Sequence, residues 1–299
     1  APLPVIGFDM GGTSTDVSRY GGSLEHVFEA TIADIQMATC QLDINTVAAG
    51  GGSKLFFKNG LFVVGPESSG AHPGPVCYRK GGYLSVTDAN VVLGRVIPKF
   101  FPKIFGATED QPLDRKGAED AFRRLITKNS IESSIESFAY GFVKVANEAM
   151  CRPIRNLTQM KGFDLSKHIL SAFGGAGPQH CCQIAKNLGI RKIMIHRHGG
   201  ILSAYGLSLA DLVSEATTPK AYVFDKLLKN RPDIDLLSDF DSLVEEAKAK
   251  LKINLSTVIK VEYFMNLRYR GTDNALMTSL TPTGAKSDGT LEFWSSFGD

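Results

Sequence analysis

The stretch that most constrains this chain is the segment VIGFDMGGTSTDVSRY, which begins at Val5. Its first residues form a short apolar run that predicts a buried strand, and the run stops at Asp9. Gly11 and Gly12 follow and permit a tight turn, because glycine adopts backbone conformations that other residues avoid. A second strand is predicted to begin at Asp16, so the whole segment is predicted to form a β-hairpin.

The loop of this hairpin has the composition of a phosphate-binding loop. Glycine lets backbone N–H groups approach phosphoryl oxygens, and the hydroxyl groups of Thr13, Ser14 and Thr15 offer further donors. Asp9 and Asp16 flank the loop, and a carboxylate can hold Mg²⁺ through water, because Mg²⁺ keeps much of its hydration shell. The alternative interpretation is an ordinary hairpin turn with solvated threonines.

Composition limits the class of protein. The chain has 299 residues, of which 43% are hydrophobic and 21% are charged, so it can bury a core in one large or two medium domains. The formal net charge is +2 and the basic residues are scattered, which argues against a nucleic-acid partner.

The sequence also bears on location. No apolar run approaches the roughly 20 residues that span a bilayer, and Ala1 leads directly into the first strand without a signal peptide. Five unevenly spaced cysteines argue against a disulfide framework and for a reducing compartment. We therefore expect a cytoplasmic protein without a membrane partner. The abrupt start and end indicate a chain cut from a longer protein.

A second glycine cluster lies in the segment TVAAGGGSK, residues 46–54. It does not fit a P-loop, because Lys54 follows Ser53 and leads into an apolar run instead of preceding Ser or Thr at the opening of a helix. We interpret it as a tight backbone passage beside a nucleotide or at a domain interface. Asn59-Gly60 then predicts a hairpin turn within residues 56–64.

Residues 65–82 are predicted to form a long loop rich in glycine and proline. His72, Cys77 and the nearby Asp88 are of residue types that bind zinc, but three scattered candidates do not make a ligand signature. A rigid proline-rich loop is the alternative. The dipeptide Thr87-Asp88 is predicted to cap a short helix.

Apolar residues at helical spacing predict a helix over residues 111–129 and a long helix over 138–157. Pro153 lies inside the second helix, so we expect a kink or a break there. Glu148 and Arg152 are four residues apart and are expected to form a solvated ion pair.

A glycine turn before a helix is typical of nucleotide sites. A strand is predicted over residues 168–173, followed by Gly174, Gly175 and Gly177 and then by a helix over 179–188. The N-terminus of a helix favours anions, and glycine allows a base or ribose to lie against the backbone. Such turns are common in α/β proteins, so this signal is weak by itself.

The chain continues with a predicted strand over residues 191–195 and a predicted helix over 203–213, joined by the segment HRHGG. Metal binding by His180 with its neighbouring cysteines, or by His196 with His198, is disfavoured. Adjacent residues on a helix or strand point to different faces, and no second pair at zinc spacing accompanies them.

Beyond Pro219 the pattern changes to a small α+β element. It consists of a charged amphipathic helix and two strands of a hairpin, predicted over residues 237–251, 258–269 and 275–280. We therefore predict two domains, which comprise residues 1–218 and 219–299.

The order of these motifs resembles a definite superfamily. A DxGxxTxD hairpin followed at a distance by a strand, a Gly-Gly turn and a helix is similar to the phosphate 2 and adenosine motifs of actin, hexokinase and Hsp70 ATPases. Segments along nearly the whole chain resemble the hydantoinase A/oxoprolinase family, among them FDMGGTSTDV, DINTVAAGGGS, VGPESSGAHPGPVCYRKGG, TDANVVLGR, VANEAMCRPIR, FGGAGPQH, SAYGLSLAD and LRYRGTD. The resemblance implies an α/β, ribonuclease H-like ATPase fold that is incomplete in this chain.

The resemblance also implies an activity. It is the ATP-dependent hydrolysis of 5-oxo-L-proline to L-glutamate, a step of glutathione turnover, in which ATP phosphorylates the lactam oxygen. The implied cofactors are ATP and Mg²⁺, and the small-molecule partner is 5-oxo-L-proline.

The resemblance assigns roles to residues of the two glycine motifs. Asp9 would orient Mg²⁺ through water, and Asp16 would either lie near the metal or fix the loop. With Thr15, these two form the implied catalytic set. The phosphates would be cradled by Gly11, Gly12, Thr13 and Thr15. The adenosine would lie against Gly174, Gly175 and Gly177.

Two parts of the family pattern are missing from this chain. One is a first phosphate hairpin, expected upstream of Asp9, and the other is a hydantoinase B-like half, expected after the last residue. We therefore expect the isolated chain to lack turnover. The resemblance implies that the full-length protein is a homodimer. The alternatives are a hydantoinase-type or acetone-carboxylase-type ATPase subunit and a non-catalytic nucleotide-binding module.

Overall fold

The computed structural model describes residues 3–27, 30–32, 35–37, 41–221, 236–251, 260–271, 276–280, 283–285 and 291–292. The chain divides into two compact units, residues 1–208 and 209–299. This division falls shortly before the domain boundary that we predict after residue 218, and the domain assignment itself stays a prediction.

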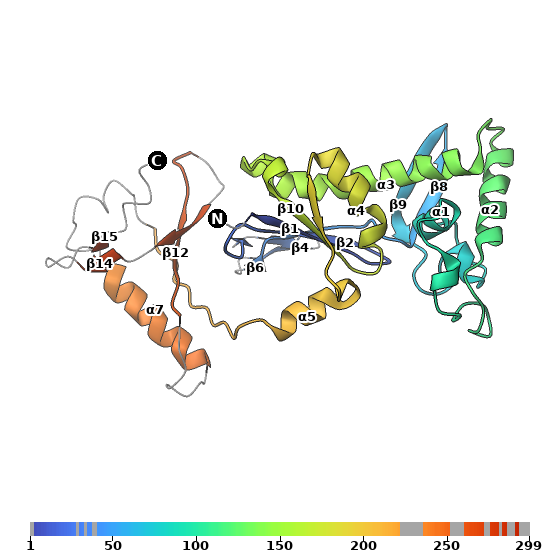
Figure 1. Ribbon diagram of the computed structural model, residues 1–299. Coiled ribbons are helices and arrows are strands. Elements are labelled where there is room, and N and C mark those ends of the chain that lie inside the picture. The colour runs from blue at the N-terminus through green and yellow to red at the C-terminus, as the bar shows by residue number, and fades with distance from the viewer. Residues whose placement is uncertain are drawn as a thin grey trace. The chain divides into compact units, whose positions relative to one another are not determined.

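A five-stranded sheet organises the first unit, with the strand order β11-β10-β1-β2-β7. Its strands are β1 (Val5–Met10), β2 (Thr15–Tyr20), β7 (Ile44–Val47), β10 (Ile169–Phe173) and β11 (Lys192–Met194). Neighbours among β1, β2 and β7 are antiparallel, whereas β1, β10 and β11 are parallel. The predicted hairpin is confirmed, and strands from distant parts of the sequence flank it (Figure 1).

The first unit also contains helices. They are α1 (Val86–Val92), α2 (Arg115–Lys128), α3 (Ile135–Leu157), α4 (Gly177–Leu188) and α5 (Leu202–Ser208), with 3₁₀ turns at Val76–Tyr78, Pro98–Phe100, Gln159–Lys161, Leu165–Lys167 and Gly199–Ile201. Figure 1 shows α3 running along the sheet, and both α3 and α4 contact its strands. Ile6, Phe8 and Met10 are buried in the core, because successive residues of a strand alternate between faces. Asp9 therefore lies on the opposite, partly covered face of β1.

Smaller antiparallel hairpins complete the strands of the first unit. They pair β3 (His26–Val27) with β6 (Gln41–Leu42), β4 (Ala30–Ile32) with β5 (Ile35–Met37), and β8 (Ser53–Lys58) with β9 (Leu61–Ser68). At the turn between β8 and β9, Asn59 and Gly60 have φ values of 53° and 79°. Two consecutive positive φ angles are what a two-residue hairpin turn requires, so the prediction from Asn-Gly is confirmed.

Helix α3 differs from its predicted form at two points. It continues through Pro153, so of the two predicted alternatives the break is wrong and the kink stays a prediction. Ile154, the residue after the proline, is fully buried, and this packing favours continuation of the helix. The predicted ion pair is also wrong, because Glu148 pairs with Arg155 instead of Arg152. Residues seven apart lie on the same helix face, two turns along.

Helix α1 begins earlier than predicted and has a different cap. Its N-cap is Ser85 and not Thr87-Asp88, because Asp88 occupies the third helical position and accepts from the N–H of Ser85 at 2.8 Å. The same carboxylate accepts from the N–H groups of Val76 at 3.1 Å and Cys77 at 2.8 Å. Asp88 therefore closes the proline-rich loop through main-chain hydrogen bonds.

The second unit contains α7 (Leu236–Leu251), the pair β12 (Tyr263–Leu267) and β13 (Leu276–Leu280), and the pair β14 (Thr283–Ala285) and β15 (Leu291–Glu292). The antiparallel pairing of β12 with β13 confirms the predicted hairpin, although β12 is shorter than predicted. Its turn lies outside the described residues.

Helix α5 ends at Ser208 and not at residue 213 as predicted. Leu209, Leu212 and Val213 are exposed, so no core packing supports a longer helix. Within the described ranges, no helix combines the length and the apolar character needed to cross a bilayer.

Gly141 of α3 generates a stability prediction. A Cβ at Gly141 would lie 2.5 Å from Cζ of Phe62, whose ring is held by Phe138 and Phe142 at centroid separations of 5.1 and 4.8 Å. Alanine favours a helix by about 1 kcal/mol over glycine, but overpacking costs about 1–3 kcal/mol. We expect Gly141→Ala to lower the free energy of unfolding, measured in urea, while the exposed Asn156→Ala changes it by less than about 0.5 kcal/mol. A Gly141→Ala protein at least as stable as the wild type would contradict this packing.

Candidate functional site

Three glycine-containing turns meet at one edge of the sheet. The parallel strands β1, β10 and β11 all end at this edge, and β1 leads into Gly11-Gly12 while β10 leads into Gly174-Gly175. The N–H of Ala176 donates to the carbonyl of Met10 at 2.9 Å, and the N–H of Gly174 donates to the carbonyl of Gly199, after β11, at 2.9 Å. The carboxyl ends of parallel strands are where open α/β sheets bind ligands.

The second glycine cluster packs on the first turn. The N–H of Gly51 donates to the carbonyl of Gly11 at 3.0 Å, and the N–H of Gly52 donates to the carbonyl of Gly12 at 2.6 Å. In a planar trans peptide the N–H points opposite to the C=O, so the N–H groups of Gly12 and Thr13 point away from this cluster. Both residues are exposed, and no described residue accepts from these two N–H groups. The turn thus presents two adjacent donors to an anion.

Gly50 and Thr15 hold the two glycine segments together. A Cβ at Gly50 would lie 2.7 Å from the carbonyl oxygen of Gly12 and from the nitrogen of Thr13, so a side chain does not fit. Thr15 is fully buried, and its hydroxyl donates to the carbonyl of Ala49 at 2.6 Å. The structure therefore gives Thr15 a structural contact, where the sequence predicted a phosphate ligand. The second cluster is the support behind the first turn.

Two carboxylates stand next to each other in a row of side chains across the sheet. The register pairs Phe173 of β10 with Asp9, Asp9 with Asp16 of β2, and Asp16 with Thr46 of β7. Directly paired residues project on the same face, so the row lies on the partly covered face. The hydroxyl of Thr46 donates to Oδ1 of Asp16 at 2.6 Å. Like charges placed opposite each other repel, and a cation bound between them would offset the repulsion.

The carboxylate of Asp9 contacts both of the other turns. Gly174 has a φ of +78°, and a Cβ there would overlap Oδ1 of Asp9. Ser203 of α5 donates its hydroxyl to Oδ2 of Asp9 at 2.7 Å. In the sequence, Ser203 stands out only as the first residue of a predicted helix. The signal that could have found it is the HRHGG turn after a third parallel strand, since such turns converge at one edge.

A buried polar network fixes α4 behind the second glycine turn. His180 is fully buried, with Nδ1 at 2.7 Å from Oδ1 of Asn147 in α3 and Nε2 at 2.9 Å from Nδ2 of Asn90 in α1. These amide partners assign the ring proton to Nδ1. Burial, with a smaller contribution from the charge of Arg95, lowers the pKa of His180 to about 3. His180 is therefore a neutral connection between three helices.

The other candidate metal ligands are separated or engaged. His72 is exposed and Cys77 is buried, and the Asp88 carboxylate is taken by main-chain donors. Nδ1 of His196 accepts from the N–H of His198 at 3.1 Å. In the part of the chain that the structure describes, no three His, Cys, Asp or Glu side chains are grouped to hold a metal ion.

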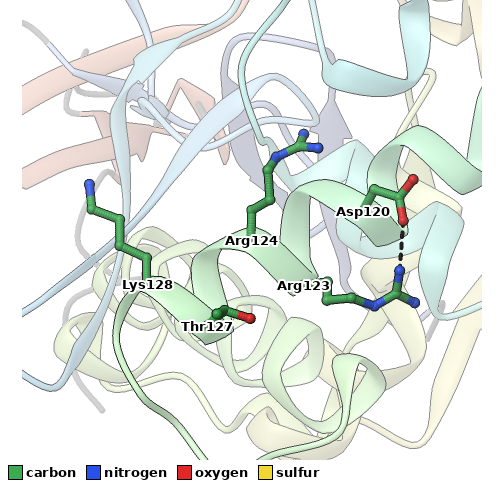
Figure 2. Close-up of a pocket in the computed structure, with 5 residues that line it drawn as sticks. All are labelled: Asp120, Arg123, Arg124, Thr127 and Lys128. Carbon is green, nitrogen blue, oxygen red and sulfur yellow. Dashed lines mark hydrogen bonds and ion pairs between the residues drawn. The ribbon is translucent and has the colours of Figure 1, made fainter.

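Figure 2 shows a shallow pocket on the surface of α2, lined by Asp120, Arg123, Arg124, Thr127 and Lys128. Asp120 and Arg123, two neighbouring lining residues, form an ion pair at 2.7 Å. All of its lining comes from one helix, and none comes from the three turns. The pocket is therefore separate from the candidate site.

The predicted site residues fall into three groups. Asp9, Asp16, Gly11, Gly12, Thr13 and Gly174 are brought together at the sheet edge, as described above. No atom lies within 4 Å of a Cβ built at Gly175, whereas Gly177 packs on the main chain of Phe8 with a Cβ 3.6 Å from its carbonyl oxygen. Thr15 is buried away from the turn surface. The roles of these residues stay predictions.

The sheet, its helices and the converging turns define the ribonuclease H-like ATPase fold of the actin, hexokinase and Hsp70 type, and the predicted fold class is confirmed. Similar solved structures are ATP-dependent caprolactamase from Pseudomonas jessenii, with 28% identity and a TM-score of 0.77, and acetone carboxylase, with 22% identity and a TM-score of 0.64. Each match covers 93% of this chain and 40% of the other chain.

The sequence specifies the family within this fold. The model of the hydantoinase/oxoprolinase family matches residues 3–216, and the chain belongs to that family. It is 54% identical to a 5-oxoprolinase from Dictyostelium discoideum over 92% of its own length and 22% of the relative's length. The chain thus spans about a fifth of the length of this relative.

The buried His180 generates a prediction about pH. The unfolded chain protonates this imidazole near its ordinary pKa of 6.5, whereas the folded state keeps it neutral down to a pKa of about 3. The unfolded state therefore binds more protons between these values, so the contribution of neutral His180 to stability is complete above pH 6.5 and is lost as the pH falls toward 3.

We expect the unfolding free energy of the wild type to fall more steeply with acidification than that of His180→Gln, by about 1 kcal/mol per pH unit. Urea unfolding of both proteins between neutral pH and about pH 5 measures the difference. Parallel pH profiles would show that His180 is not held neutral.

Proposed function

We propose that this chain is the nucleotide-binding part of an ATP-dependent amidohydrolase that opens the lactam of 5-oxo-L-proline to L-glutamate. The observation that carries the proposal is the Asp9–Asp16 pair beside the two outward N–H donors of the first turn. The likeness to a 5-oxoprolinase supports the substrate. The likeness to a caprolactamase described as ATP-dependent supports the use of ATP for opening a cyclic amide.

The first turn suits the β- and γ-phosphates of ATP. The N–H groups of Gly12 and Thr13 point to one side, and the exposed hydroxyl-bearing side chain of Thr13 adds a further donor. The N–H of Gly11 donates to the carbonyl of Ser14 at 3.1 Å, so Gly11 shapes the turn. A cradle of main-chain donors is pre-organised, because the second glycine cluster holds its carbonyls.

Asp9 and Asp16 fit Mg²⁺, because this ion prefers oxygen ligands and keeps several waters when few carboxylates are present. Asp9 would bind Mg²⁺ through a water molecule. The hydrogen bond from Thr46 restrains Asp16, so that a second carboxylate lies on the same face of the sheet as Asp9. Bound there, Mg²⁺ would neutralise charge on the phosphates during transfer.

We assign the adenosine to the turn after β10. The open space at Gly175 leaves room for a base or ribose. Gly177 packs against β1 at ordinary van der Waals distance, and the positive end of the α4 dipole faces the same edge. In this placement, the main role of Gly174 is its contact with Asp9.

The chemistry needs ATP because a lactam is a stabilised amide that water attacks slowly. Transfer of the γ-phosphoryl group to the lactam oxygen would give an imidate-like phosphate. Water would then add to the activated carbon, and the C–N bond would open to give an acyl phosphate. A second water molecule would hydrolyse this acyl phosphate, so that glutamate and inorganic phosphate would leave beside ADP. Phosphoryl transfer of this kind depends on positioning and charge neutralisation, which are the contributions assigned to Asp9, Gly12 and Thr13.

In this proposal the activity belongs to the whole protein, since the chain spans about a fifth of its 5-oxoprolinase relative. A hydantoinase B-like half of the same protein would complete ring opening. The protein would act in glutathione turnover in the cytoplasm, as a homodimer, and the isolated chain would lack turnover.

A second candidate is a hydantoinase-type or acetone-carboxylase-type ATPase subunit, because acetone carboxylase shares this fold. ATP hydrolysis by the intact protein, measured with 5-oxo-L-proline, hydantoin and acetone in turn, separates the candidates. Stimulation by 5-oxo-L-proline is expected. Stimulation by another compound would reassign the substrate, and ATP binding without hydrolysis would favour a non-catalytic module.

Gly50→Ala tests the support of the phosphate turn. The added methyl group would collide with the peptide that joins Gly12 to Thr13, and we expect ATP hydrolysis by the intact protein to fall by about 10- to 100-fold. Gly206→Ala is the matched control, because no atom lies within 4 Å of a Cβ there, and it should retain full activity. Wild-type activity in Gly50→Ala would separate the second glycine cluster from the site.

Asp9→Asn tests the metal assignment. The change keeps the size of the side chain and removes the charge, so we expect kcat for ATP hydrolysis to fall by at least about 100-fold. Asp110→Asn makes the same change at an exposed residue that contacts Thr108 and should have no effect. Unchanged turnover in Asp9→Asn would refute the role.

The substitution Asp16→Asn distinguishes the two roles proposed for Asp16. Asp16→Asn should weaken the apparent affinity for Mg²⁺ if this carboxylate faces the metal. If Asp16 only fixes the loop, the substitution should instead lower the unfolding midpoint and leave the Mg²⁺ dependence unchanged.

A further inference from the structure

The segment that follows β11 forms a third wall of the site, and neither the family motifs nor the proposed function gives it a role. It reaches the site through two contacts. The carbonyl of Gly199 accepts from the N–H of Gly174, and the hydroxyl of Ser203 donates to Oδ2 of Asp9 at 2.7 Å. Among the described residues, Ser203 alone donates a side-chain hydrogen bond to Asp9.

We propose that Ser203 is a positioning residue, which orients the carboxylate of Asp9 toward the cation and which is itself held in place by the rings of His196, His198 and Tyr205. This inference rests on the proposed function, since it takes the cation beside Asp9 to be Mg²⁺ with ATP.

The geometry explains why Asp9 needs such a residue. The terminal torsion of an aspartate is soft, so the carboxylate plane rotates easily when nothing restrains it. Ser203 holds Oδ2, while the main chain at Gly174 passes directly against Oδ1. The single proton of the Ser203 hydroxyl is used in this bond, and the remaining lone pairs of the carboxylate would be available to the water shell of a cation. Partners of this kind orient metal-binding groups in other proteins.

A cluster of three rings fixes the helix that carries Ser203. The rings of His196 and Tyr205 are stacked, with an interplanar angle of 24° and centroids 5.4 Å apart. The ring of His198 lies 5.4 Å from His196 and 5.6 Å from Tyr205. The hydrogen bond from the N–H of His198 to Nδ1 of His196 closes the turn. Since α5 has only seven residues, these contacts and not helix length determine where Ser203 lies.

The test is a measurement of cation binding in the intact protein. Mn²⁺ replaces Mg²⁺ as a spectroscopic probe, and its binding is followed by electron paramagnetic resonance in the presence of a non-hydrolysable ATP analogue. We expect Ser203→Ala to raise the dissociation constant for Mn²⁺ by about tenfold, because loss of an orienting partner has effects of this size. Ser203→Thr keeps the hydroxyl group and should bind as the wild type does.

Ser208→Ala is the matched control, because Ser208 lies on the same helix and its hydroxyl donates only to the carbonyl of Tyr205, at 2.7 Å. It should leave Mn²⁺ binding unchanged. Tyr205→Leu removes the ring stack and should weaken Mn²⁺ binding in the same direction as Ser203→Ala.

The outcomes distinguish the positioning role of Ser203 from the proposed function on which it rests. Tight Mn²⁺ binding by the wild type together with equally tight binding by Ser203→Ala would overturn the role of Ser203 and leave the proposed function standing. Absence of nucleotide-dependent Mn²⁺ binding by the wild type would overturn the proposed function and the inference with it. Weakened binding in both Ser203→Ala and Ser203→Thr would also overturn the role, because the hydroxyl would then not be the group that matters.

Discussion

The site depends on one contact between main-chain segments, in which Gly51 and Gly52 donate to the carbonyls of Gly11 and Gly12. Because the peptide bond is planar, this contact also sets the direction of two N–H groups. Holding the carbonyls of Gly11 and Gly12 toward the second glycine cluster points the N–H groups of Gly12 and Thr13 away from it. The side chain of Gly50 must be absent for the segments to come so close. The anion-binding geometry is therefore a property of main-chain packing, and it explains why two glycine clusters 40 residues apart belong to one structure.

The topology of the sheet determines where the two carboxylates of the site lie. The hairpin register sets Asp9 opposite Asp16, and the parallel strands β10 and β11 bring their turns to the same edge. Each element contributes to the site. β1 and its turn supply main-chain donors and the carboxylate of Asp9. The turn after β10 supplies Gly174, which lets the chain pass Asp9, and the segment after β11 supplies Ser203. The buried connection of His180 to Asn90 and Asn147 then fixes α4 to the helices behind it.

Local patterns in the sequence predicted the elements of this site, but not the contacts between them. The hairpin at Asp9, the Asn59-Gly60 turn and the strand before Gly174 follow from periodicity and turn chemistry, which act over a few residues. The burial of Thr15 could not be predicted in this way, since its partner at Ala49 lies in another segment. The same holds for Ser203, whose partner is the distant Asp9, and for the unbroken α3, where burial of Ile154 outweighs the effect of a proline on the helix.

The chemistry of the described groups limits what this part of the protein can specify. Main-chain N–H donors at Gly12 and Thr13 and the carboxylates of Asp9 and Asp16 match phosphates and a hard cation, and these groups are common to any reaction that uses Mg·ATP. Nothing in their geometry distinguishes a five-membered lactam from a larger cyclic amide or a ketone. The fold that this chain shares with a caprolactamase and an acetone carboxylase is consistent with that limit, because one fold can host several different reactions. In the proposed function, substrate choice would then come from side chains that meet the acceptor, while the groups described here would serve the nucleotide.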